Sequence, residues 1–142
     1  ILLKRNSDGT IDGYLHDFGF MTRQGKFVGG TMPYLPPEII SQRRVTKEMD
    51  NFALGASIIE LIAPDEFPKR FNILGKKSQK QMNKFIEDVR QKLSKEKNPM
   101  QKEIKLKMLD VAAQLLTVDL NGRLSLKDAI RELTNLQDEI PN

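Results

Sequence analysis

The chain has 142 residues, which suits one modest domain. It contains no Cys and a single His, so disulfide frameworks, thiolate zinc sites, multi-histidine metal sites and conventional nucleophilic triads are largely excluded. A hydrophobic fraction of 39% and a charged fraction of 30% are ordinary for a globular protein. No apolar run approaches the roughly 18 residues of a membrane span. The lack of Cys suits a cytoplasmic location, which we expect.

The net charge of +4 is unevenly distributed along the chain. Residues 69–107 hold 13 Lys+Arg and 4 Asp+Glu, a balance of +9, whereas the remainder has a balance of −5. A basic block of this kind could meet nucleic acid, an anionic membrane or an acidic protein. We favour a solvated, lysine-rich helical face. Nucleic acid is not an expected partner, because Phe71 and Phe85 are the only aromatic residues in the block.

The first 45 residues predict two short strands and a long loop. Residues 1–3 and 11–15 are apolar runs, and residues 6–9 between them read NSDG, which is turn chemistry. Residues 20–45 are rich in Gly and Pro and predict an irregular, shaped loop.

Apolar residues then recur at helical spacing. Residues 50–62 place apolar groups around a whole helix, which predicts a buried helix that Pro64 ends. Three amphipathic stripes follow, the last of them opened by Ser125 and Asp128 at capping-box spacing. The stripes are Met82, Phe85, Ile86, Val89 and Leu93; then Ile104, Met108, Val111, Ala112, Leu115 and Leu116; then Leu126, Ala129, Ile130 and Leu133.

Four short motifs occur in order along this plan. Asp17-Phe18-Gly19 follows the second strand, and residues 30–38 read GTMPYLPPE, a G-T-x-x-Y-x-x-P-E pattern. Residues 50–55 read DNFALG at the start of the buried helix, and residues 119–123 read DLNGR before the last helix. Each motif is weak alone, but their order is specific. The chain resembles the eukaryotic-type protein kinase family over essentially its whole length.

The resemblance implies a mainly α fold, the C-terminal lobe of a protein kinase, as part of the α+β kinase-like fold. About four helices would surround one buried helix. We expect one partial domain over 1–142 that starts just after the catalytic loop. Residues 1–19 would hold the strands and the Asp-Phe-Gly motif, 20–38 the activation segment, and 46–142 the helical subdomain. The sequence departs from the family at Pro36, where Ala is usual, and at Phe52-Ala53, where Trp-Ser is common.

Phosphoryl transfer needs a hard cation to bridge the nucleotide phosphates, and carboxylate oxygen suits Mg²⁺. The resemblance assigns this catalytic and metal-binding role to Asp17, with ATP as the nucleotide. It makes Phe18 the hydrophobic switch residue and lets the backbone turn at Gly19, beside the cofactor. His16, just before Asp17, is expected to be structural.

The resemblance also assigns substrate contacts to Gly30, Thr31 and Tyr34. Thr31 would bridge the catalytic Asp and a neighbouring Lys, which favours Ser/Thr over Tyr specificity. Tyr34 would form a wall of the pocket for the substrate residue after the acceptor. The alternative is that Thr31 and Tyr34 only satisfy turn hydrogen bonds.

Three further residues are expected to be structural. Glu38 and Arg123 would form a buried ion pair beneath the activation segment, and losing one partner would strand a charge. Asp50 would oppose the dipole of the buried helix and accept backbone N–H bonds, which in the family come from the catalytic loop.

The function implied is transfer of the ATP gamma-phosphate to protein Ser/Thr by the parent kinase. The glycine-rich lid, the strand Lys, its Glu partner, the catalytic Asp and the metal-binding Asn do not occur in these residues, so we expect the piece itself to be inactive. The alternative is a pseudokinase-type scaffold that binds a protein partner. Expected partners are a protein substrate, the missing N-terminal lobe and, through exposed strand edges, a second copy. The composition is also consistent with a bacterial protein acting in a host cell.

Overall fold

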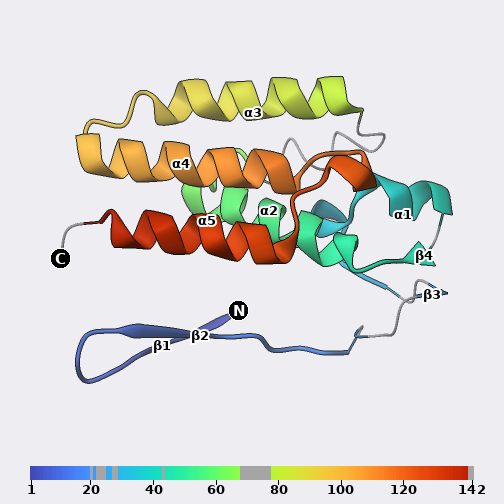
Figure 1. Cartoon of the computed structure of the whole chain (residues 1–142), viewed down its shortest axis with the longest axis horizontal. Coiled ribbons are helices and arrows are strands. Elements are labelled where there is room, and N and C mark those ends of the chain that lie inside the picture. The colour runs from blue at the N-terminus through green and yellow to red at the C-terminus, as the bar shows by residue number, and fades with distance from the viewer. Residues whose placement is uncertain (20, 22–24, 27–28, 43, 68–77, 141–142) are drawn as a thin grey trace.

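The structure is a computed structural model that describes residues 1–19, 21, 25–26, 29–42, 44–67 and 78–140. It consists of a hairpin at the N-terminus and a bundle of helices (Figure 1). The mainly helical architecture, preceded by the two short antiparallel strands of the N-terminal hairpin, confirms the predicted fold class.

The hairpin joins β1 (Leu2–Arg5) to β2 (Ile11–Tyr14) in antiparallel register. Its turn is closed by Gly9, whose φ of 87° suits a residue without a side chain. The Asp8 carboxylate accepts hydrogen bonds from the hydroxyl and the backbone N–H of Thr10, at 2.6 and 2.9 Å. These two bonds, the hydroxyl first, lower the pKa of Asp8. The turn predicted at NSDG is therefore present, with the strands on either side of it.

Residues 20–45 contain more regular structure than the predicted irregular loop. The two-residue strands β3 (Gly25–Lys26) and β4 (Arg44–Val45) pair antiparallel, and η1 (Met32–Tyr34) and α1 (Pro37–Gln42) lie between them. The predicted loop is wrong at α1, because Pro37 does not indicate a loop at this position. Pro is favoured at the first position of a helix because its fixed φ is already helical. The N–H that Pro lacks would have no hydrogen-bond partner within the helix at this position.

The helix α2 (Glu48–Ile62) is the predicted buried helix, and it ends just before Ala63 and Pro64. Phe52, Ala56 and Ile59 are fully buried. The all-round burial predicted for this helix is wrong at Leu61, which is 72% exposed. Apolar residues all round a helix predict that the helix lies in the interior. The pattern does not show that other segments cover every side of it.

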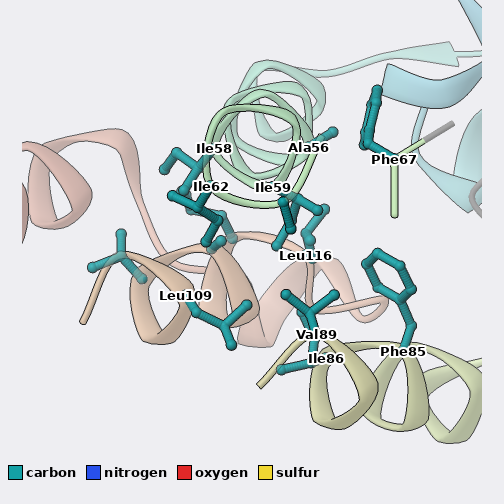
Figure 2. Packing of buried hydrophobic residues seen from close by; sticks show 14 of the residues in the cluster. Ala56, Ile58, Ile59, Ile62, Phe67, Phe85, Ile86, Val89, Leu109 and Leu116 are labelled. Carbon is teal, nitrogen blue, oxygen red and sulfur yellow. The ribbon is translucent and has the colours of Figure 1, made fainter. Parts of the chain in front are cut away.

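Three longer helices complete the bundle: α3 (Gln79–Leu93), α4 (Pro99–Leu115) and α5 (Leu126–Asp138), with η2 (Leu120–Gly122) before α5. The helix α4 packs against α2, α3 and α5. Figure 2 shows Ile59 of α2 above Leu116, the residue that directly follows α4. Val89 of α3 lies close to both. All five apolar residues of the stripe predicted for α3 are buried.

The stripe predicted for α5 is only partly buried. Ser125 caps the helix, accepting the Asp128 N–H at 3.1 Å, which confirms the predicted start. Ala129 is fully buried, but Leu126 and Ile130 are 46% and 55% exposed. The buried face is turned towards Ala129 and Leu136, a residue that the predicted stripe omitted.

The helices α2 and α4 approach each other closely at Gly55. A Cβ atom placed there would lie 2.9 Å from Leu115 Cβ and 2.9 Å from Leu116 Cγ. Such distances are shorter than real Cβ contacts, so the two helices meet at this spacing because residue 55 has no side chain.

We expect Gly55→Ala to lower the free energy of unfolding by about 1–3 kcal/mol through overpacking. Helix propensity alone predicts the opposite sign, since Ala is favoured over Gly by roughly 1 kcal/mol. Urea unfolding of the two proteins measures the difference. Ser57→Ala on the same helix is the control and should change stability little. A more stable Gly55→Ala protein would show that α2 and α4 do not pack as described.

Candidate functional site

Asp17 has an unusual backbone conformation. Its φ is 64°, and among the described residues it is the only one other than Gly with a positive φ. Asp tolerates this region better than most residues, yet the conformation still costs energy and is enriched at functional positions. Gly19 is not in this region, so the unusual turn falls on the carboxylate residue itself. The Asp17 side chain is exposed, at the end of the segment that follows β2.

The residues around Asp17 are also exposed. Phe18 is 58% exposed, so it does not pack into the described core, and His16 is exposed as well. Within the described ranges, no three His, Asp or Glu side chains are grouped to hold a metal ion. Asp17 can therefore offer one carboxylate to a cation, and the other ligands would have to come from elsewhere.

The predicted substrate-binding residues lie in and next to η1. The Thr31 carbonyl accepts the Tyr34 N–H at 3.0 Å, while the Thr31 side chain is exposed. Gly30 leaves room for a neighbour, since a Cβ atom there would lie 2.6 Å from Leu35 Cδ2. The turn hydrogen bond is thus present at the backbone, and the Thr31 hydroxyl makes no bond within the described residues.

Tyr34 is held by contacts with residues distant in sequence. Its hydroxyl donates a hydrogen bond to Glu60 Oε2 on α2 at 2.6 Å, and its ring centroid lies 5.3 Å from that of Phe67. The bond to Glu60, together with partial burial and the nearby negative charge, raises the pKa of Tyr34 to about 12. The sequence analysis missed Glu60, because a partner 26 residues away leaves no local signal.

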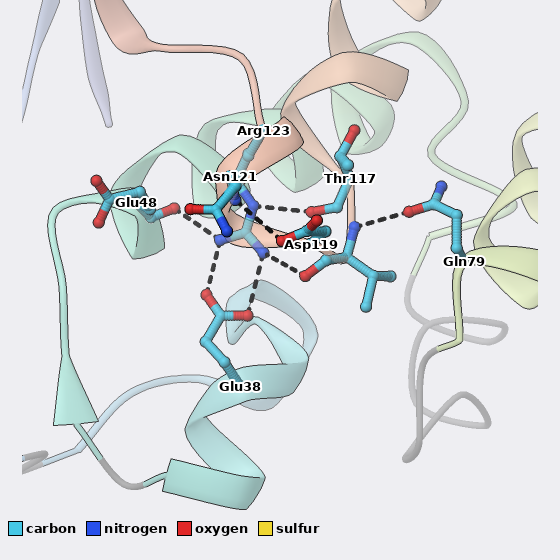
Figure 3. A network of polar contacts seen from close by, with 8 residues as sticks. Glu38, Glu48, Gln79, Thr117, Asp119, Asn121 and Arg123 are labelled. Atoms are coloured by element: carbon cyan, nitrogen blue, oxygen red, sulfur yellow. Dashed lines mark hydrogen bonds and ion pairs between the residues drawn. The ribbon is translucent and has the colours of Figure 1, made fainter.

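The structure brings Glu38 and Arg123 together in a buried network (Figure 3). Arg123 Nη1 and Nη2 donate to the two Glu38 carboxylate oxygens at 2.7 and 3.1 Å. Nη1 also donates to the Glu48 carbonyl, Nε to the Thr117 carbonyl, and Nη2 to the Val118 carbonyl at 3.4 Å. All five N–H groups of the guanidinium therefore have an acceptor.

The surroundings of Arg123 complete its burial. The Arg123 side chain is 0% exposed and that of Glu38 is 7% exposed. The guanidinium carbon lies 5.1 Å from the centroid of the Phe52 ring. Because its acceptors belong to α1, the start of α2 and the segment after α4, this one side chain links three parts of the bundle.

Asp50 lies in the first turn of α2 and is exposed. The helix begins at Glu48, and its cap residue Lys47 makes no capping hydrogen bond through its side chain. Asp50 accepts no hydrogen bond from the described residues, although its position still opposes the helix dipole. That Asp50 accepts hydrogen bonds from backbone N–H groups remains a prediction.

A comparison with protein families gives a match to the description Protein kinase domain over residues 1–133. The match includes Asp17, Glu38 and Arg123. The chain belongs to the protein kinase family. A search of curated proteins and one of solved structures gave no match. The helical bundle with its hairpin is that of the kinase C-terminal lobe. Among the described helices, none combines the length and apolarity that crossing a membrane requires.

We expect Arg123→Met to lower the free energy of unfolding of the kinase lobe by about 3–5 kcal/mol, because it strands the buried Glu38 charge. Adding Glu38→Gln should recover part of this loss, since the stranded group is then neutral. Urea unfolding of the two single variants and the double variant gives the coupling. Arg131→Met is the matched control. Its exposed ion pair with Asp128 predicts a loss of about 0–1 kcal/mol. Equal losses at both arginines would contradict the network.

We also expect the raised pKa of Tyr34 to be visible in an alkaline titration. The pKa of Tyr34 is raised to about 12, so its neutral form is favoured by folding. The stabilisation is fully present below the unfolded-state pKa near 10 and is lost as the pH rises through the folded-state value. Phenolate absorbance during an alkaline titration measures this, and Tyr34→Phe should remove the component that titrates near pH 12. A component near pH 12 that persists in that variant would refute the assignment.

Proposed function

We propose that this chain is the C-terminal lobe of a Ser/Thr protein kinase catalytic domain that transfers the gamma-phosphate of ATP to protein Ser or Thr. The observation that carries the proposal is Asp17, an exposed carboxylate in a strained conformation directly after the hairpin. Strain of this kind persists where a side chain must be aimed at a ligand. The domain division proposed with it is 1–19, 20–38 and 46–142.

The Asp17 carboxylate fits Mg²⁺ as one ligand of several. Mg²⁺ usually keeps waters and takes one or two protein carboxylates together with substrate phosphate oxygens. When bound with ATP it would neutralise the charge that develops on the transferring phosphoryl group. Asp17 would hold the cation, with Phe18 and Gly19 beside the nucleotide.

The segment from Gly30 to Tyr34 would receive the protein substrate. The Thr31 side chain is exposed and free to bridge a catalytic Asp and Lys, which is the contact that favours Ser/Thr specificity. The Tyr34 ring is held by the hydrogen bond that its hydroxyl donates to Glu60. Because Tyr34 is bonded to α2 through Glu60, its ring would stay in place while a substrate residue packs against it.

Catalysis would require the N-terminal lobe and the catalytic loop, so these 142 residues alone should not transfer phosphate. Both faces of the hairpin carry exposed apolar side chains, such as Leu2 and Leu3 at 57% and 74%. A two-stranded hairpin is marginal unless it packs against something. The N-terminal lobe would cover it in the intact domain, and self-association would cover it otherwise.

The test compares phosphate transfer from ATP–Mg²⁺ to a basic protein by this chain and by the same chain extended upstream to a full catalytic domain. Activity is expected only in the extended protein. Asp17→Asn should abolish it, because Asn tolerates the same backbone conformation and is nearly isosteric but carries no charge. Asp65→Asn, at another exposed carboxylate, is the matched control and should keep activity.

Asp17→Gly separates the charge from the backbone conformation, since Gly adopts a positive φ freely. It should be as inactive as Asp17→Asn. Activity in Asp17→Asn would overturn the metal role. Silence of the extended protein, without Mg²⁺-dependent nucleotide binding, would favour the pseudokinase-type scaffold instead.

A further inference from the structure

The segment between α4 and α5 contains the one Asn-Gly pair of the sequence, Asn121-Gly122. Both residues are exposed, and they lie in η2, a single turn of 3-10 helix. The backbone N–H of Asn121 donates to Asp119 Oδ1 at 3.0 Å (Figure 3). The side-chain amide of Asn121 forms no hydrogen bond with the described residues. No such bond therefore holds this amide away from the backbone that follows it.

An Asn side chain can react with the backbone nitrogen of the next residue, which is one reason why Asn is thermolabile. Here the Gly122 nitrogen would lose its proton to hydroxide and bond to Asn121 Cγ. The bond from Cγ to the side-chain nitrogen breaks, and that nitrogen takes a proton from water and leaves as ammonia. Water then opens the five-membered imide. Opening at Cγ gives aspartate, and opening at the main-chain carbonyl gives isoaspartate, in which the chain continues through Cγ.

Gly122 is the residue that hinders this attack least. A side chain after Asn crowds the approach of the nitrogen to Cγ, whereas Gly has no side chain and reaches more backbone conformations. The Gly122 N–H donates to the Asp119 carbonyl at 3.2 Å, and the Arg123 N–H to the Leu120 carbonyl at 3.4 Å. Both distances are at or beyond the long end of the usual range. Local opening of η2 would free the Gly122 nitrogen without unfolding the bundle.

We propose that Asn121 is a site of spontaneous deamidation, and that its isoaspartate product loosens the network of Arg123 and Glu38. Both products also place a new negative charge next to the Asp119 carboxylate, which accepts the backbone N–H of residue 121. The proposal depends only on the segment between α4 and α5 and its contacts. It is therefore independent of the proposed phosphoryl transfer.

The effect on the network follows from the length of the main chain. Isoaspartate adds one C–C bond of about 1.5 Å to the backbone, two residues before Arg123. The segment is fixed on both sides of this point. Arg123 Nε donates to the Thr117 carbonyl at 2.9 Å, and the Leu124 N–H donates to the Gln114 carbonyl at 3.1 Å. The extra length therefore has to move Arg123, and a buried donor that loses its acceptor is costly.

The experiment incubates the whole chain and measures deamidation by peptide mass. Trypsin cuts after Lys107 and Arg123, so one peptide, residues 108–123, contains Asn121 as its only Asn. Its mass should rise by about 1 Da as the amide becomes a carboxyl group. The rise should be faster in mildly alkaline than in mildly acidic buffer, because hydroxide removes the proton of the attacking nitrogen.

Asn83 is the reference within the same molecule. It is exposed on α3, but Lys84 follows it, and its side-chain oxygen accepts a hydrogen bond from Gln79 Nε2 at 2.7 Å. The tryptic peptide of residues 81–84 reports on it. Asn83 should deamidate at least about tenfold more slowly than Asn121, which corresponds to a barrier difference of about 1.4 kcal/mol.

Gly122→Ala is the matched variant. A Cβ atom at residue 122 would lie 3.4 Å from Thr117 Cγ2, an ordinary contact, and the φ of Gly122 is not positive, so the fold should accept Ala. The added methyl group should slow deamidation of Asn121 several-fold. Asn121→Gln keeps the amide and should not deamidate on the same timescale, because its attack would close a less favoured six-membered ring.

Thermal unfolding tests the effect on the network. The isoaspartate form, separated by chromatography, should unfold at a temperature lower than the parent by about 4 °C or more. Asn121→Asp brings the charge without the added backbone carbon, so its unfolding temperature should lie closer to that of the parent.

Deamidation at Asn121 that is no faster than at Asn83, or that Gly122→Ala leaves unchanged, would overturn the proposed site. An isoaspartate form as stable as the parent would overturn its effect on the Arg123 network. Rapid deamidation that depends on Gly122, with the largest loss of stability in the isoaspartate form, would support both parts of the proposal.

Discussion

The position of α1 in the bundle depends on the burial of one guanidinium group. Once the Arg123 charge is out of water, each of its five donors requires an acceptor, and the acceptors lie on α1, at the start of α2 and after α4. An ion pair of this kind adds little net stability, but any arrangement that removes an acceptor is costly. The network therefore selects one relative placement of these segments.

The two halves of the proposed site are held very differently. Tyr34 is fixed through Glu60 to α2, and Glu38 is fixed through Arg123, so the substrate side is built on the bundle. Asp17 follows a hairpin whose strands are exposed along their whole length. The strained conformation of Asp17 thus has little local support in the described residues. This difference is the physical reason why the metal side would need a second lobe to become organised.

Sequence patterns predicted the elements better than their contacts. The hairpin turn, the buried faces of α2 and α3, and the cap of α5 all follow from local rules on spacing and capping. The short helix α1 was missed because Pro37 has opposite meanings inside a loop and at the first helical position. Leu61 and Ile130 are apolar but exposed, since a pattern shows what a residue could bury and not what covers it. The bond of Glu60 to Tyr34 and the close helix packing at Gly55 were not predicted, because both are contacts between segments far apart in the sequence.

Charge is used in two opposite ways in this lobe. At Arg123 every donor is matched inside the protein, and the result is a unique arrangement of segments. At exposed pairs such as Arg131 and Asp128, water solvates both charges, and the pair adds only about 0–1 kcal/mol. The arrangement of the segments therefore depends on the buried pair and not on the exposed ones.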